Sequence, residues 1–219
     1  VVKAMILAAG RGERMRPLTD HTPKPLLEVN GKALIEYHLE GLKRAGINQV
    51  VINTGWLGEQ IPQRLGDGGR YDLEIRYSAE PQQPLETAGG IVQALPLLGD
   101  HPFLVVNGDL YTDYPFEQLT DERGSLVHLV LVENPLHHPV GDFTLQQGKV
   151  TGYGGGEGQL TYSGMARFDP RFFEGVEEGR LPLAPLLYHA VNRGEASGEY
   201  YRGIWSDVGT AERLAQLQQ

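Results

Sequence analysis

Residues 5–17, which read MILAAGRGERMRP, join an apolar run to a glycine-containing loop that is rich in arginine. The stretch of residues 2–9, which is apolar except for Lys3, predicts a short buried strand that ends at the glycines. Gly10 and Gly12 let the backbone turn tightly and approach a ligand without a Cβ clash. Successive backbone N–H groups in such a turn form a concavity that binds anions. The segment therefore predicts a first strand that leads into a phosphate-binding loop.

Positive charge surrounds this loop. Arg11, Arg14 and Arg16 lie in it, and Lys24 follows between two prolines. An arginine guanidinium is planar and pairs well with phosphate oxygens. The two prolines restrict the backbone on both sides of Lys24, so that its side chain is aimed in one direction. The alternative is a plain strand-to-loop turn with solvated arginines. Because that alternative does not account for the aimed lysine, we predict phosphate binding.

Two common glycine motifs are absent from the loop. The dinucleotide-binding pattern G-x-G-x-x-G needs a third glycine at the position where Met15 stands. The Walker A pattern G-x-x-x-x-G-K-[ST] does not occur. The sequence therefore disfavours a dinucleotide-binding oxidoreductase and a P-loop ATPase.

The composition is that of an acidic globular protein. Its 219 residues carry a formal net charge of −9 at pH 7 and include no cysteine. A nucleic-acid binder normally has a basic face, and no apolar stretch reaches the length of a membrane span. We therefore expect neither a nucleic acid nor a membrane as a partner. The lack of cysteine excludes disulfides and thiolate metal sites and suits a cytoplasmic location. An anionic substrate would then require local cations and a divalent metal.

The order of the predicted elements indicates the fold class. After the first strand, helices are expected at residues 33–45, 57–65 and 87–95, and strands at 49–53, 73–77 and 103–107. The second half is richer in strands, at residues 125–132, a hairpin over 143–153, 160–168 and an extended 198–205, with helices at 182–193 and 210–217. This order predicts an α/β, Rossmann-like mixed sheet that is mostly parallel, with helices on both faces. We expect a single domain over residues 1–219. No hexapeptide repeat occurs, so no C-terminal β-helix is expected.

Two aspartates far apart in the chain are candidate metal ligands. Asp109 follows the predicted strand at residues 103–107, and Asp207 lies in the string WSDVGT. Open α/β sheets bind ligands beyond the carboxyl ends of their strands, where Asp109 is expected to lie. Two carboxylates, together with phosphate oxygens and water, form a suitable Mg²⁺ site. Either aspartate alone could equally be a cap or loop residue.

The loop and the aspartates also carry a family resemblance. The string L-A-A-G-x-G-x-R-M-x-P-L-T-x-x-x-P-K-P-L, which begins at Leu7, resembles the signature of sugar-1-phosphate nucleotidylyltransferases. The resemblance implies the fold of the nucleotide-diphospho-sugar transferases. It also implies that Arg14 and Lys24 contact phosphates and act in catalysis, and that Asp109 and Asp207 bind Mg²⁺ together.

The same resemblance implies two sets of binding residues. The residues expected to contact the nucleotide surround the glycine loop and the segment TAGG, and are Ala8, Ala9, Gly10, Arg11, Gly12, Gln82, Gly89, Gly90 and Asn107. The residues expected to face the sugar phosphate are Asn53, Asp109, Gly141, Glu157, Ser163 and Gly164. For Trp56 a core position is favoured over stacking on a sugar. The pair His137 and His138 is interpreted as surface loop, because no acidic neighbour is evident.

The reaction implied is Mg²⁺-dependent transfer of a nucleotidyl group from a nucleoside triphosphate to a sugar 1-phosphate, with release of pyrophosphate. The short chain and the motifs PKPL, LETAGG and VNGD look most like the uridylyltransferases of bacterial cell-wall recycling, which use UTP and N-acetylmuramate 1-phosphate. Three alternatives remain open: guanylyl transfer to mannose 1-phosphate, uridylyl or thymidylyl transfer to glucose 1-phosphate, and a regulator that binds nucleotide sugars without catalysis. The oligomeric state is not predicted.

Overall fold

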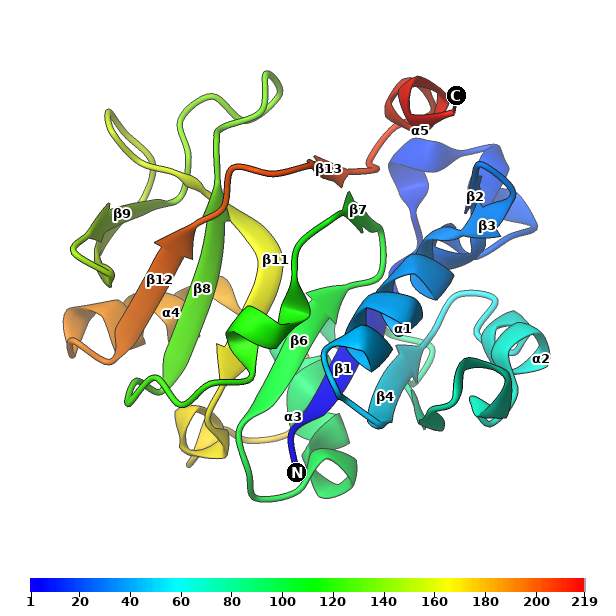
Figure 1. Ribbon diagram of the computed structural model, residues 1–219, viewed down its shortest axis with the longest axis horizontal. Helices are drawn as coiled ribbons and strands as arrows, with labels where there is room; N and C mark the ends of the chain where they lie inside the picture. The colour runs from blue at the N-terminus through cyan, green and yellow to red at the C-terminus, as the bar shows by residue number, and fades with distance from the viewer. Residues whose placement is uncertain (219) are drawn as a thin grey trace.

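The computed structural model describes residues 1–218, and a nine-stranded sheet runs through it in the order β5-β4-β1-β6-β11-β8-β12-β10-β9 (Figure 1). The strands of this sheet are β1 (Lys3–Ala8), β4 (Gln49–Thr54), β5 (Glu74–Ala79), β6 (Phe103–Asn107), β8 (Val127–Val132), β9 (Phe143–Gln146), β10 (Lys149–Tyr153), β11 (Thr161–Phe168) and β12 (Ala196–Tyr200). Two small ribbons pair β2 (Glu28–Val29) with β3 (Lys32–Ala33), and β7 (Leu110–Thr112) with β13 (Trp205–Asp207).

The helices are α1 (Leu34–Arg44), α2 (Gln60–Leu65), α3 (Glu86–Leu98), α4 (Ala184–Asn192) and α5 (Ala211–Leu217). Short 3₁₀ turns occupy Glu13–Met15, Leu18–Asp20, Lys24–Leu26, Gly69–Tyr71, Phe116–Leu119 and Pro170–Phe173. Within residues 1–218, none of the helices combines the length and the hydrophobicity needed to cross a membrane.

The strand β1 lies between two parallel neighbours, β4 and β6. Strand β5 adds to β4 in the same direction, whereas β11 pairs with β6 in the antiparallel sense. The carboxyl ends of β1, β4, β5 and β6 therefore meet at one edge of the sheet. That edge is the place where open α/β sheets bind ligands.

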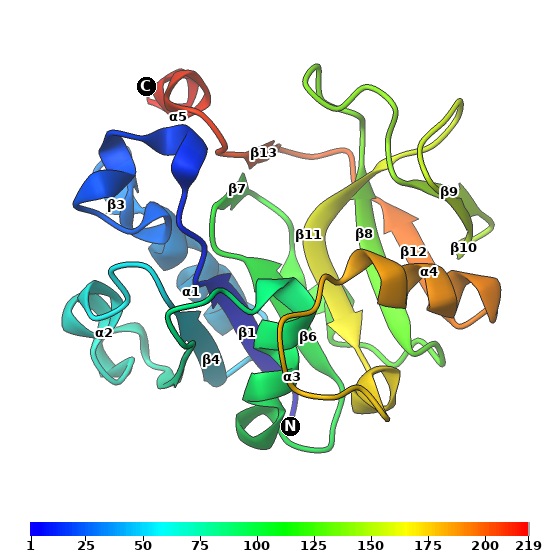
Figure 2. The same ribbon diagram turned by 180° about the vertical axis from the view of Figure 1, so that it is seen from behind.

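Helices cover both faces of the sheet. Helix α1 lies on the face seen in Figure 1, and α3 and α4 lie on the face seen in Figure 2. The alternation of side chains along β1 explains both layers, because successive residues of a strand point to opposite faces. Ile6 is buried in the cluster with α1, whereas Met5 is buried in the cluster with α3. This arrangement confirms the predicted mixed, mostly parallel α/β sheet.

Helix α1 was predicted to within one residue at each end. It is amphipathic, and its buried side includes Leu34, His38 and Leu42. The Glu36 carboxylate accepts a hydrogen bond from the Ala33 backbone N–H at 3.1 Å, which satisfies a free donor at the first turn. The chain then leaves the helix through Gly46, whose φ of 81° lies in the left-handed region.

Several predicted boundaries differ from the structure. Helix α3 continues to Leu98, because Pro96 is accommodated within its last turn. The extended segment predicted at residues 198–205 is divided into the end of β12 and the start of β13. Strand β7 was not predicted, because three residues are too few for a periodic signal. The β7–β13 ribbon matters for the site, because it pairs Leu110 with Asp207 and so joins the two aspartate segments.

Gly108 allows the turn after β6 to lie against β1. Its backbone N–H donates to the Leu7 carbonyl at 2.8 Å, and a Cβ at this position would lie 2.7 Å from the same oxygen. We predict that Gly108→Ala lowers the free energy of unfolding by about 1–3 kcal/mol, because a backbone carbonyl must shift to make room. Chemical denaturation measures this change. Gly69→Ala is the matched control, since its Cβ would meet only the exposed Asp67 side chain at 3.3 Å. Equal stability of the two variants would contradict the proposed constraint.

Candidate active site

A cavity of about 390 Å³ lies at the carboxyl ends of β1, β4 and β6. Its lining comes from the end of β1 and the glycine loop, the segment around Lys24, strand β4, the segment between β5 and α3, the start of α3, the end of β6 with the turn after it, and the segment before α5. The residues that line it are Leu7, Ala8, Ala9, Gly10, Gly12, Glu13, Arg14, Met15, Lys24, Pro25, Asn53, Glu80, Pro84, Glu86, Thr87, Asn107, Asp109 and Gly209. The cavity thus brings together both predicted catalytic residues and most of the predicted nucleotide contacts.

The glycine loop is held from behind by Thr19. The Thr19 hydroxyl donates to the Gly12 carbonyl at 2.8 Å, and Thr19 itself is fully buried. Gly12 has a φ of 69°, and a Cβ there would lie 2.9 Å from the Thr19 side chain. Glycine is therefore required at this position both by conformation and by space. The loop keeps one shape while its backbone faces the cavity.

Arg11 and Arg14 have different surroundings. The Arg11 guanidinium donates to the Thr19 carbonyl at 3.1 Å and pairs with Asp20 at 3.0 Å. The hydrogen bond from Arg11 holds the pKa of the Asp20 carboxyl below its usual range. Arg11 does not line the cavity, whereas the exposed Arg14 does, and within residues 1–218 Arg14 forms no ion pair. Arg14 is thus the loop arginine whose charge is available to a ligand.

Trp56 is not a core residue, and the prediction that placed it there was wrong. Its side chain is 38% exposed, its ring lies under the Arg11 guanidinium at 3.9 Å, and its indole N–H donates to the Thr19 carbonyl at 2.8 Å. A cation over an aromatic face is an attractive contact. Trp56 therefore fixes Arg11 and the glycine loop from the end of β4.

Lys24 reaches the turn after β6. Its ammonium group lies 2.7 Å from the Asp109 carboxylate, and its side chain is only 12% exposed. The flanking Pro23 and Pro25 hold the 3₁₀ turn that begins at Lys24. The predicted aim of the lysine is thus toward the cavity, where it meets a predicted metal ligand.

The two predicted metal ligands come from neighbouring backbone segments. The Val208 backbone N–H donates to the Asp109 carbonyl at 3.1 Å, next to the β7–β13 ribbon. The side chain of Asp207, however, is held by Arg213 at 2.6 Å and by His137 at 2.9 Å. Asp207 does not line the cavity, although Gly209, two residues further along the chain, does.

The histidine pair lies in a surface loop, as predicted, but both residues have acidic neighbours, which the prediction had not found. His137 contacts Asp207, and His138 lies 2.8 Å from Asp142. Asp207 is far along the chain from His137, so no local pattern could reveal that contact. The Asp142 contact spans four residues and could have been found from the sequence.

The donor chemistry of Asp109 and Asp207 fits a divalent cation. Carboxylate oxygens are the ligands that Mg²⁺ prefers, and it usually takes one or two carboxylates together with water and substrate phosphates. Within residues 1–218, no group of three or more His, Asp or Glu side chains is arranged to hold an ion. The oxygens of a bound substrate would therefore have to complete the coordination. Lys24 and Arg213 at present neutralise the two carboxylates.

A second cavity of about 470 Å³ adjoins the first and shares Glu86, Thr87 and Asn107 with it. Its other lining residues come from β9, β11 and α4 and the segments before them, and are Asp142, Phe143, Tyr162, Pro182, Leu183, Ala184, Leu187 and Tyr188. Asp142 and Tyr162 were missed by the sequence reasoning. Both lie next to a predicted residue, Gly141 and Ser163 respectively, but not at the predicted position.

The four predicted sugar contacts from the second half of the chain line neither cavity. Gly141 packs against Gln159, and a Cβ on it would lie 2.7 Å from the Gln159 carbonyl. Ser163 is buried, and Gly164 packs against the Asn107 side chain. Glu157 is exposed in a second loop rich in glycine, residues 154–158, which follows β10. Their roles as substrate contacts stay predictions.

The predicted base contacts after β5 are also outside the lining. Gln82 is exposed. A Cβ on Gly89 would lie 2.2 Å from the Gly179 carbonyl, and one on Gly90 would lie 2.4 Å from the Glu80 carboxylate. The space beside these glycines is therefore filled by protein atoms. Glu80, which sequence reasoning did not select, lines the cavity instead.

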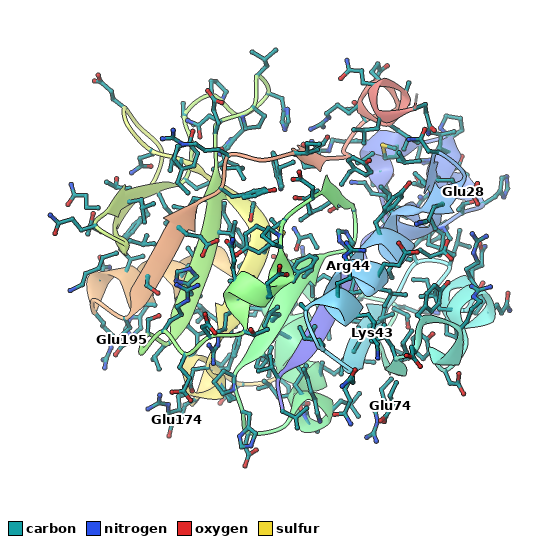
Figure 3. The ribbon with its side chains drawn as sticks, in the orientation of Figure 1. Glu28, Lys43, Arg44, Glu74, Glu174 and Glu195 are labelled. Carbon is teal, nitrogen blue, oxygen red and sulfur yellow. The ribbon has the colours of Figure 1, made fainter. Side chains whose placement is uncertain are left out.

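Acidic side chains lie both far from the site and within it. Glu74, Glu174 and Glu195 lie along the edge of the molecule away from β7 and β13 (Figure 3). Glu74 begins β5, and Glu195 precedes β12. The cavity lining also carries Glu13, Glu80, Glu86 and Asp109, so an anionic ligand there depends on the cations Arg14 and Lys24.

The comparisons with known proteins agree with this geometry. A protein named N-acetylmuramate alpha-1-phosphate uridylyltransferase from Neisseria meningitidis serogroup B is 53% identical over 99% of this chain and 97% of its own length. A protein of the same name from Caulobacter vibrioides is 34% identical over 94% of this chain and 91% of its own length. A solved structure described as a putative glucose-1-phosphate thymidylyltransferase from Bacillus anthracis superposes with a TM-score of 0.89 at 21% identity, over 99% of this chain and 94% of that one, and thus shares the fold.

The profile of one family also matches the chain directly. The description of that family is nucleotidyl transferase, and the match extends over residues 3–134, which include the glycine loop, Lys24 and Asp109. Together with the identity to the Neisseria protein, this match shows that the chain belongs to the nucleotidyl transferase family, as an enzyme that transfers nucleotidyl groups to sugar 1-phosphates.

Proposed function

We propose that this enzyme transfers the uridylyl group of UTP to N-acetylmuramate 1-phosphate, with Mg²⁺, and releases pyrophosphate. The observation that carries the proposal is the joint placement of Arg14, Lys24 and Asp109 around one cavity at the carboxyl edge of the sheet. The choice of substrates rests on the 53% identity to the Neisseria relative that is named for this reaction. We further propose that the reaction serves cell-wall recycling in the cytoplasm, which agrees with a chain that has no cysteine.

The chemistry needs alignment more than it needs an acid or a base. The phosphate oxygen of the sugar 1-phosphate attacks the α-phosphorus of UTP, a new O–P bond forms, and the bond to the leaving pyrophosphate breaks. The nucleophile is already an anion, so no general base is required. The site must mainly neutralise and orient two anions.

The residues divide this task between them. Arg14 binds the β- and γ-phosphates, and Lys24 stabilises the charge that develops at the transferred phosphorus. Asp109 and Asp207 would hold Mg²⁺, which would supply further charge neutralisation when bound. The second cavity, with Asp142, Tyr162 and Tyr188 in its lining, is the proposed place of the sugar.

A substrate grid tests the proposal. Pyrophosphate release is measured with UTP, dTTP and GTP against N-acetylmuramate, glucose and mannose 1-phosphates, each with Mg²⁺. The highest kcat/KM is expected for UTP with N-acetylmuramate 1-phosphate. A preference for GTP with mannose 1-phosphate would instead assign guanylyl transfer. Binding of nucleotide sugars without turnover of any pair would assign a regulator.

The metal assignment predicts the effect of removing either carboxylate. Asp109→Asn and Asp207→Asn should each lower Mg²⁺-dependent turnover by at least about 10²-fold, because a charged ligand is lost. The stabilisation of the protein by Mg²⁺ with UTP, measured as a shift in Tm, should disappear as well. Asp100→Asn is the matched control, since Asp100 is exposed at the opposite edge of the sheet. Turnover like that of the wild type in either variant would remove that aspartate from the metal site.

Lys24 should act on the chemical step. Lys24→Ala is expected to lower kcat by roughly 10²–10³, the cost of losing one group that stabilises charge in the transition state. Lys32→Ala is the control, because Lys32 pairs with Glu40 outside the cavity. Steady-state kinetics separates the two cases. A rise in KM with kcat unchanged would show that Lys24 only binds substrate.

A further inference from the structure

We infer that Asn53 and Glu80 form a positioning pair. The pair connects the end of β1, which leads into the glycine loop, to the segment before α3, and so sets the affinity for the triphosphate. The inference rests on the proposed function, because it concerns the same cavity. Both residues line that cavity. An asparagine at position 53 and a glutamate at position 80 do not suggest such a pair from the sequence alone.

Asn53 connects two strands through its side chain. It is only 3% exposed, and its carboxamide oxygen accepts a hydrogen bond from the Ala8 backbone N–H at 2.7 Å. Ala8 is the last residue of β1 and leads directly into the glycine loop. The carboxamide nitrogen donates to the Glu80 carboxylate at 3.0 Å. One side chain thus links the start of the phosphate loop to Glu80.

Glu80 extends this link to the third helix. Its second carboxylate oxygen accepts from the Leu85 backbone N–H at 3.3 Å, just before α3. Its own backbone N–H donates to the Thr54 carbonyl at 2.8 Å. The Glu80 side chain therefore closes the loop of residues 81–85 against the end of β4. That loop forms one wall of the cavity through Pro84.

Gly90 makes room for the pair. A Cβ at this position would lie 2.4 Å from the Glu80 carboxylate and 2.9 Å from the Asn53 nitrogen. The glycine is thus explained by the close packing of α3 on Asn53 and Glu80.

The pair positions the walls of the cavity and does not itself bind the nucleobase. Both Glu80 oxygens already accept hydrogen bonds from protein groups, one from Asn53 and one from Leu85. Burial raises the pKa of the Glu80 carboxyl, and these two hydrogen bonds oppose that rise. A buried polar group that loses such a partner keeps its desolvation penalty, so breaking one bond should disturb both walls.

An exchange of the two side-chain types tests the pair. In Asn53→Asp, a carboxylate oxygen replaces the amide nitrogen and faces the Glu80 carboxylate. In Glu80→Gln, an amide nitrogen must face either the Asn53 amide or the Leu85 N–H, and one hydrogen bond is lost. In the double variant, the new amide at position 80 donates to the new carboxylate at position 53, while the amide oxygen accepts from the Leu85 N–H. Every hydrogen bond of the wild type is then restored, with the donor and the acceptor exchanged in one of them.

The affinity for UTP, measured by titration calorimetry, and the kinetic constants provide the readout. Each single variant should weaken UTP binding and raise the KM for UTP about tenfold, with less effect on the KM for the sugar phosphate. The double variant should return to within about threefold of the wild type. Gln49→Glu with Glu74→Gln is the matched control, since that exposed amide–carboxylate pair joins β4 to β5 at the opposite edge, with 3.2 Å between its atoms. The control variants should bind UTP as the wild type does.

Each outcome distinguishes the claims. If the wild type binds UTP but the double variant is no better than the worse single variant, the inference is wrong and the proposed function stands. If the single variants lower Tm without changing UTP affinity, the pair is only structural and the inference is likewise wrong. If the wild type binds no nucleoside triphosphate, the proposed function fails, and the inference fails with it.

Discussion

The ion pair between Lys24 and Asp109, 2.7 Å long, is the interaction on which the site depends. It joins the segment after the glycine loop to the turn after β6, and so brings a predicted phosphate contact against a predicted metal ligand. A partly buried ion pair gains little net stability, because removing the charges from water offsets their attraction. Its value lies in placing a cation and an anion at the same edge of the sheet, ready for a polyphosphate and a metal.

The pairing of charges at the site bears on how an acidic protein could bind two anions. The net charge is −9, and the cavity lining itself carries four acidic residues, Glu13, Glu80, Glu86 and Asp109, beside Arg14 and Lys24. Asp207 is paired with Arg213 and contacts His137, and Asp20 is paired with Arg11. Local pairing therefore matters more to the site than the overall charge does. The β7–β13 ribbon then fixes the distance between the two aspartate segments through backbone hydrogen bonds.

Sequence reasoning predicted the parts of the site that local pattern determines. The strand β1, the aim of Lys24 between two prolines and the position of Asp109 after β6 all follow from neighbouring residues. Trp56 was misjudged, and the acidic neighbour of His137 was missed, because their partners, Arg11 and Asp207, are distant in the chain. Glu80 was missed for a similar reason: the sequence does not show that the Glu80 carboxylate fills the space beside Gly90. The fold class was predictable from the order of elements, whereas the short ribbon that joins the aspartates was not.

The fate of the oxygen between C1 and phosphorus of the sugar phosphate tests the central claim most directly. N-acetylmuramate 1-phosphate that carries ¹⁸O in the oxygen between C1 and phosphorus is turned over with UTP, and the nucleotide sugar is analysed by mass spectrometry. Attack by a phosphate oxygen on the α-phosphorus of UTP leaves the labelled bond untouched, so the account predicts that all of the label stays in the product. Loss of the label would mean that the C1–O bond breaks, and it would contradict nucleotidyl transfer at this site.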